Sequence, residues 1–86
     1  MKQFSYMIQD ELGIHARPAG KLLSLAKNYS DTIITISKGE KNVKAGQLIK
    51  LMNMGIKKGD KIKIAADGDE EDQAIVALKA FFEENL

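Results

Sequence analysis

Apolar residues recur every second position in some segments and every third or fourth in others, and this switching constrains the fold more than any other feature. The two-residue spacing predicts half-buried strands, because successive side chains of a strand point to opposite faces. The residues that show this spacing are Phe4, Tyr6 and Ile8 near the start, and Ile62, Ile64 and Ala66 near the end. Residues 33–37 are rich in β-branched side chains and predict a third strand, followed by a turn at residues 38–41 and a short partner strand around Val43.

The three- and four-residue spacing predicts helices with one apolar stripe. The first stripe consists of Ala19, Leu22, Leu23, Ala26 and Tyr29, and the last consists of Ala74, Ile75, Leu78, Phe81 and Phe82. A short helix is expected at residues 47–53, with Gly55 ending it. Asp69 is the predicted N-cap of the last helix, with acidic residues 70–72 in its first turn, where the helix dipole favours negative charge.

The expected element order is β-α-β-β-α-β-α, in one domain that spans residues 1–86. Each strand shows about one apolar face, so helices should cover one side of an antiparallel sheet. The fold class is therefore α+β, an open-faced sandwich of three helices on four strands. The order alone does not separate this fold from other α+β sandwiches, including ferredoxin-like ones.

Composition excludes several classes of function. The chain has no cysteine, so it forms no disulfide and has no thiolate chemistry. Its formal charge of +1 and the absence of a basic stripe with interleaved aromatic residues argue against a nucleic-acid partner. No apolar run is long enough to cross a membrane, so we expect a soluble cytoplasmic protein that does not insert into membranes. We also expect a monomer.

Residues 13–19, with the sequence GIHARPA, contain the only histidine and the only proline of the chain. Proline is favoured in the first turn of a helix, so Pro18 predicts that a helix starts close to His15. The backbone N–H groups of Ala16 and Arg17 then lack intrahelical acceptors, and such a helix end can bind phosphate or another anion. The Arg17 guanidinium adds a fixed positive charge and a fork of donors that suits phosphate oxygens.

The helix start and Arg17 both disfavour a protonated imidazole at His15, and the neutral imidazole is the nucleophilic form. The segment therefore predicts a nucleophile that accepts an anionic group. The alternative is that His15 is a surface or capping residue, as most single histidines are. A metal site has less support, since the chain has one histidine and no cysteine, and we expect no metal and no cofactor. A hydrolase also has less support, because no second histidine or nucleophile elbow is present.

The GIHARPA segment resembles the active-site pattern of HPr, the histidine-containing phosphocarrier family of the bacterial sugar phosphotransferase system, at every position. The resemblance covers essentially the whole chain, in length, element order and the later segment LMNMGIKKGD. It implies that His15 accepts phosphate from enzyme I on Nδ1 and passes it to a sugar-permease A domain (enzyme IIA). It implies that Arg17 contacts the phosphate, and that the chain is a carrier rather than an enzyme. The family fold agrees with the open-faced sandwich predicted above.

The short second helix is apolar nearly all round. Since only one face can enter the core, an exposed apolar surface is one interpretation, and a fully buried helix is the other. The resemblance favours the first interpretation, because the family uses apolar residues in this helix for docking, and Leu48, Ile49 and Met52 occupy those positions. Gly20, Ser24 and Lys27 would lie on the same side, along the first helix. Gly20 costs about 1 kcal/mol of helix propensity against alanine, and its small size would let a partner approach closely.

Besides Gly20, two features depart from a typical member of the family. One residue is extra between Tyr29 and Val43, so either Ile34 and Ile36 or Ile33 and Thr35 face the core. The first choice buries more apolar area, and we predict it. The second departure is Gln47, which occupies the position where many Firmicute-type members carry a regulatory serine. We therefore predict no regulatory serine at this helix.

The residues leave three functions to compare. The first is a phosphoryl carrier, and the second is a regulatory binding module of the same fold that uses phosphorylation of His15 only as a signal. The third is a small domain in which His15 merely caps a helix. Arg17 and the helix start favour the first over the third, but they do not separate the first from the second.

Overall fold

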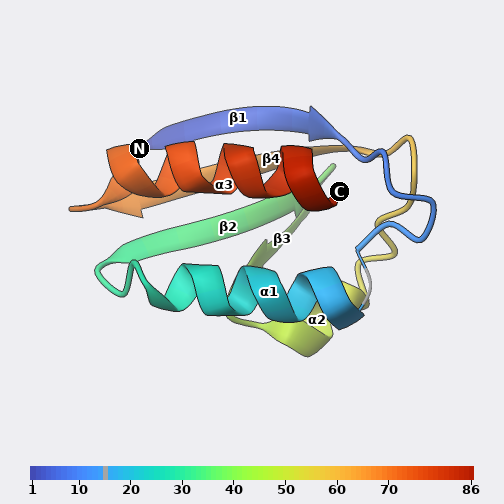
Figure 1. Ribbon diagram of the computed structural model, residues 1–86, viewed down its shortest axis with the longest axis horizontal. Coiled ribbons are helices and arrows are strands. Elements are labelled where there is room, and N and C mark those ends of the chain that lie inside the picture. The colour runs from blue at the N-terminus through green and yellow to red at the C-terminus, as the bar shows by residue number, and fades with distance from the viewer. Residues whose placement is uncertain (15) are drawn as a thin grey trace.

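Figure 1 shows the computed structural model, which describes residues 1–14 and 16–86. The elements follow the expected order, and three helices accompany a four-stranded sheet. The elements are β1 (Lys2–Met7), α1 (Ala16–Lys27), β2 (Thr32–Lys38), β3 (Lys41–Lys44), α2 (Leu48–Met52), β4 (Lys61–Gly68) and α3 (Glu71–Asn85). The α+β open-faced sandwich predicted from the sequence is confirmed.

The sheet is antiparallel, with the strand order β1-β4-β2-β3. One row of paired residues crosses all four strands and consists of Phe4, Ile64, Ile36 and Val43. The helices lie over the face that carries this row (Figure 1), and the three branched residues of the row are buried. The core therefore lies between this face and the apolar stripes of α1 and α3, whose buried members include Leu22, Leu78 and Phe82.

The extra residue before β3 does not disturb the core. Ile34 and Ile36 are 4% and 0% exposed, whereas Ile33 is 55% exposed. The predicted choice of core-facing residues is therefore confirmed. The cause is the two-residue period of a strand: alternate residues share one face of the sheet, so they are buried together or exposed together.

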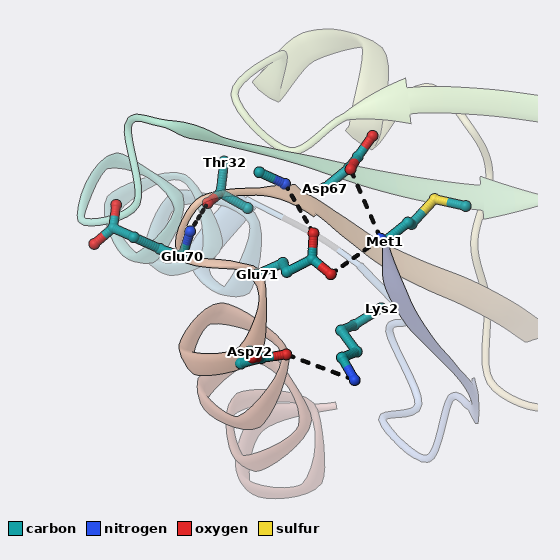
Figure 2. Close-up of polar contacts among 8 residues, drawn as sticks. Met1, Lys2, Thr32, Asp67, Glu70, Glu71 and Asp72 are labelled. Carbon is teal, nitrogen blue, oxygen red and sulfur yellow. Dashed lines mark hydrogen bonds and ion pairs between the residues drawn. The ribbon is translucent and has the colours of Figure 1, made fainter.

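The start of α3 differs from the expected arrangement. The N-cap is Glu70, not Asp69, and it makes no side-chain capping bond. The Glu70 N–H group instead donates to the Thr32 hydroxyl at 2.9 Å, so a residue 38 positions away satisfies this donor (Figure 2). The prediction that Asp69 is the N-cap is therefore wrong, because Glu70 occupies that position.

The first strand is tied to this same helix start (Figure 2). The Met1 amine lies 3.0 Å from Glu71 Oε2 and 3.8 Å from Asp67 Oδ1, and Lys2 pairs with Asp72 at 3.6 Å. The Glu71 carboxylate also accepts the Gly68 N–H at 3.2 Å. The hydrogen bond from the Met1 amine, followed by the one from Gly68, lowers the pKa of Glu71, and the pKa of the amine is raised, mainly by Glu71.

In residues 1–14 and 16–86 no helix has both the length and the apolar character needed to span a membrane. The same residues contain no group of three histidine, cysteine, aspartate or glutamate side chains that could hold a metal ion.

Candidate functional site

The loop between β1 and α1 is held in place by two distant parts of the chain. The N–H groups of Gln9 and Asp10 donate to the main-chain oxygen of Leu86, at 2.5 and 2.8 Å. The Ile14 N–H donates to the Ile56 carbonyl at 3.3 Å, and the Ile14 side chain is buried. The end of α3 and the loop after α2 therefore fix how the chain enters α1, and Figure 1 shows these segments at the same end of the molecule.

Gly13 is required by this arrangement. Its φ of +67° is in the left-handed region, and a Cβ atom built on it would lie 2.0 Å from the Ile56 carbonyl oxygen. A side chain at this position would push the two loops apart and break the approach of Ile14 to Ile56. Gly13 therefore allows the loop after α2 to pack closely against Gly13 and Ile14, the two residues that precede His15 in the sequence.

The helix α1 begins at Ala16, as the sequence predicts, and its first turn contains no acidic residue. Ala16 and Arg17 are exposed, whereas Pro18 and Ala19 are buried. The N–H groups of Ala16 and Arg17 belong to the first turn, so no carbonyl of the same helix accepts them. His15 itself lies outside the described residues, and its predicted role rests on the sequence and on the positions of its neighbours.

Arg17 lines a hollow of about 180 Å³ that the sequence analysis did not identify. The other residues around it are Asp10, Pro18, Lys21 and Asn85. Lys21 follows Arg17 by four residues, a spacing that places both on one face of a helix and could have signalled the second cation. Among the described residues neither Arg17 nor Lys21 forms a salt bridge, so the hollow holds two cations against the one carboxylate of Asp10.

The second helix exposes an apolar surface, so the alternative of a fully buried helix is wrong. Only Leu51 of α2 is fully buried, whereas Ile49 is 73% and Met52 39% exposed. Leu48 is half-buried and packs against the core. The predicted docking residues of α2 are therefore of two kinds: Ile49 and Met52 face solvent, whereas Leu48 packs partly against the core.

The remaining predicted docking residues lie along α1, which packs against α2. Gly20 is half-buried, and Ser24 and Lys27 are exposed. A Cβ atom built on Gly20 would have no atom within 4 Å, so the core does not require a glycine here. Lys27 and Gln47 line one hollow of about 350 Å³ between the last part of α1, β2 and the turn before α2. Arg17 lies ten residues before Lys27, about 15 Å along the helix.

The Gln47 side chain takes part in the turn before α2. Its Oε1 accepts the Lys44 N–H at 3.2 Å, and the Gln47 N–H donates to the Lys44 carbonyl at 2.9 Å. Gln47 is the N-cap residue of α2 but makes no side-chain capping bond to the helix. Its amide therefore closes a turn, and the residue has no hydroxyl that could be phosphorylated.

The loop after α2 is also anchored by a charged pair. Lys38 Nζ lies 2.8 Å from Asp60 Oδ2 and donates to the Gly55 carbonyl at 3.0 Å. The Asp60 carboxylate also accepts the Lys57 N–H at 2.8 Å. The hydrogen bond from Lys38, followed by that from Lys57, lowers the pKa of Asp60. This pair fixes the loop that carries Ile56 and so supports the entry to α1 indirectly.

Comparison with known proteins gives one consistent result. Residues 2–84 match the family described as "PTS HPr component phosphorylation site". The phosphocarrier protein HPr of Mycoplasma genitalium is 41% identical over 99% of this chain and 97% of its own length. The structure of HPr from Thermoanaerobacter tengcongensis has a TM-score of 0.89 and 35% identity, over 96% of this chain and 92% of that one. A mycoplasma histidine-containing phosphocarrier structure has a TM-score of 0.88 and 42% identity, over 93% and 90%.

Proposed function

This chain belongs to the HPr family of phosphocarrier proteins, and we propose that His15 is the residue on which it carries the phosphoryl group. The chain is a carrier in the phosphotransferase system and not an enzyme. The observation that carries the assignment to His15 is the helix start beside it. The N–H groups of Ala16 and Arg17, the guanidinium of Arg17 and the ammonium of Lys21 gather there, with no acidic residue in the first turn.

The proposed transfer is a displacement at phosphorus. The neutral imidazole of His15 attacks through Nδ1, the N–P bond forms, and the bond between phosphorus and the donor, enzyme I, breaks. Negative charge on the phosphoryl oxygens is stabilised by the N–H groups of the first turn and by Arg17. The same contacts hold the group weakly enough that an acceptor, the enzyme IIA domain, removes it in a second displacement.

The buried neighbours keep this geometry fixed. Pro18 and Ala19 are buried, so the first turn of α1 cannot rotate freely against the core. Gly13 and Ile14 hold the preceding loop against Ile56. A reacting group that is positioned in advance needs no reorganisation during the transfer. Such positioning, with electrostatic stabilisation, accounts for most of the rate enhancement in phosphoryl transfer.

The exposed apolar residues of α2 form the proposed docking surface for enzyme I and enzyme IIA, together with Gly20, Ser24 and Lys27 of α1. Ile49 and Met52 provide its apolar area, and methionine suits a surface that accepts more than one partner. We place the protein in the cytoplasm as a monomer, and size-exclusion chromatography with light scattering tests its oligomeric state.

Replacing Ile49 by Asp should weaken binding to enzyme I at least about tenfold with little change in melting temperature, because the side chain is exposed and apolar. Isothermal titration and a thermal melt measure the two effects. Leu48→Asp is the matched variant, and it should lower the melting temperature because Leu48 packs on the core. Unchanged affinity for Ile49→Asp would remove α2 from the docking surface.

The experiment that tests the proposed function is a two-step transfer. The protein is incubated with phosphoenolpyruvate and enzyme I, and then with an enzyme IIA domain, and each protein is read by intact mass. Phosphate that appears on the chain and then moves to enzyme IIA supports the carrier. Phosphorylation without onward transfer would support the regulatory module instead.

A further inference from the structure

The face of the sheet opposite the helices carries a polar row that the phosphocarrier site does not use. Ser5, Lys63, Ser37 and Asn42 are paired across β1, β4, β2 and β3. They lie one position away from the buried apolar row, so their side chains point to the open face. The hydroxyl of Ser37 donates to the Asn42 side-chain oxygen, and the Asn42 amide donates to the Glu40 carbonyl at 3.3 Å.

This row forms the floor of a surface hollow of about 270 Å³. Ser5, Ser37, Gly39, Asn42, Lys61, Ile62 and Lys63 line it. The ammonium groups of Lys61 and Lys63 and the hydroxyl of Ser5 are hydrogen-bond donors. Among the described residues that line the hollow, none has a carboxylate. Asp60 directly precedes β4, and its carboxylate is already paired with Lys38.

We propose that this hollow binds the phosphate group of a small phosphate ester with a polar body. Two ammonium groups favour a dianion with several acceptor oxygens, and lysine binds phosphate as a point charge. The hydroxyl and amide groups of Ser5 and Asn42 suit a hydroxylated body better than an apolar one. The hollow is too small for a folded partner to enter, so the occupant is a small molecule.

The site is separate from the start of α1. The helices cover one face of the sheet and the hollow lies on the other, so the two anion sites do not share a residue. Lys61 and Lys63 form no salt bridge with any described residue, which leaves both charges available to a ligand. Both side chains are exposed, so weak binding, on the order of millimolar, is expected.

The test is an amide NMR titration of the whole protein with glucose 6-phosphate, inorganic phosphate and glucose. The ester should shift the amide signals of residues 5, 37, 39 and 42, inorganic phosphate should bind there more weakly, and glucose should shift none of them. Shifts with glucose equal to those with the ester would overturn the proposal. Equal affinity for the ester and for inorganic phosphate would also overturn it, because the polar body would then make no contact.

Two variants of equal charge locate the binding. The double variant Lys61→Gln/Lys63→Gln should lose about tenfold in affinity, since two exposed charges each contribute modestly. The control Lys58→Gln/Lys79→Gln removes the same charge from exposed positions outside the hollow and should bind as the wild type does. An equal loss in both variants would show attraction by net charge alone and would contradict a site at this face. Shifts confined to residues near Ala16 would assign all binding to the start of α1.

Discussion

The starts of α1 and α3 are both helix N-termini at the surface, and they are completed in opposite ways. The first turn of α3 contains Glu71 and Asp72, and the Met1 amine, Lys2 and Thr32 engage the groups around it (Figure 2). The first turn of α1 has no acidic residue and carries Arg17 instead. The protein therefore has acidic side chains in the first turn of one helix, and the first turn of the other has none and is open to an anion from outside.

The difference follows from the physics of a helix end. Each N-terminus presents N–H groups without acceptors and a partial positive charge, and an anion close to it is stabilising. At α3 the anions are side chains, so this end contributes to the stability of the fold. At α1 the proposed anion is the phosphoryl group on His15, so that end contributes to transfer. The predictions below test this division of roles, from the largest expected effect to the smallest.

Substitution of His15 tests this division of roles most directly and has the largest expected effect. His15→Ala should abolish phosphorylation by enzyme I and phosphoenolpyruvate, because no other histidine is present. The helix α1 begins at Ala16 and its buried residues are Pro18, Ala19 and Leu22, which the substitution leaves in place, so the variant should keep the wild-type circular dichroism spectrum. Intact mass measures the label. A variant that is labelled as fully as the wild type would remove the acceptor from this helix start.

Arg17 tests whether the charge at the start of α1 serves the phosphate. Arg17→Ala should still be phosphorylated but should transfer about 10²-fold more slowly, because one prearranged phosphate contact is lost. Arg17→Lys should recover part of the rate, since it keeps the charge and loses the fork of donors. Rapid-quench measurement of transfer to enzyme IIA gives the rates. An unchanged rate for Arg17→Ala would exclude Arg17 from the transfer.

The start of α3 should respond in stability rather than in transfer. The pKa of Glu71 is lowered from its ordinary 4.5, so its stabilising effect is present above that value and is lost as pH falls through the pKa of the folded state. The pKa of the Met1 amine is raised from 8.0. The contribution of the charged amine to stability is therefore present below that value and is lost as pH rises through the raised pKa. The pair therefore stabilises the fold between about pH 5 and 8.

Glu71→Gln should lower the melting temperature within this pH range and flatten its dependence on pH, while the transfer rate stays unchanged. Thermal melts between pH 3 and 10 measure this, and Glu84→Gln is the control that removes a negative charge from the other end of α3. Parallel curves for Glu71→Gln and the wild type would show that the ion pair does not stabilise the fold.

The sequence predicts those parts of the fold that depend on local periodicity. The two-residue spacing is sufficient to choose Ile34 and Ile36 as the core-facing residues, and the structure confirms the choice. The start of α1 is likewise predicted from Pro18, because proline acts through its own backbone. These signals are local, so neighbours in the sequence are enough to read them.

Features that depend on distant contacts were missed. The sequence pattern predicts Asp69 as the N-cap of α3, because it cannot show that Glu70 takes this position with its N–H bonded to Thr32, 38 positions away. The close approach of Gly13 to Ile56 and the position of Asn85 beside Arg17 likewise depend on how the elements pack. The composition of α2 left its exposure open, and only packing determined that Leu51 is buried and Ile49 is not.

The central claim, that the first turn of α1 carries no acidic residue so that it can receive a phosphoryl group, is tested most directly at Ala16. Ala16 is exposed and is the first residue of α1, so Ala16→Glu places a negative charge where α3 has one. The rate of phosphorylation by enzyme I is compared between Ala16→Glu and Ala16→Gln, which match in size, at low and high salt. The account predicts that Ala16→Glu melts at a higher temperature than Ala16→Gln but is phosphorylated more slowly. The difference between the two phosphorylation rates should decrease at high salt, because salt screens the added charge. Equal rates for the two variants at low salt would contradict it.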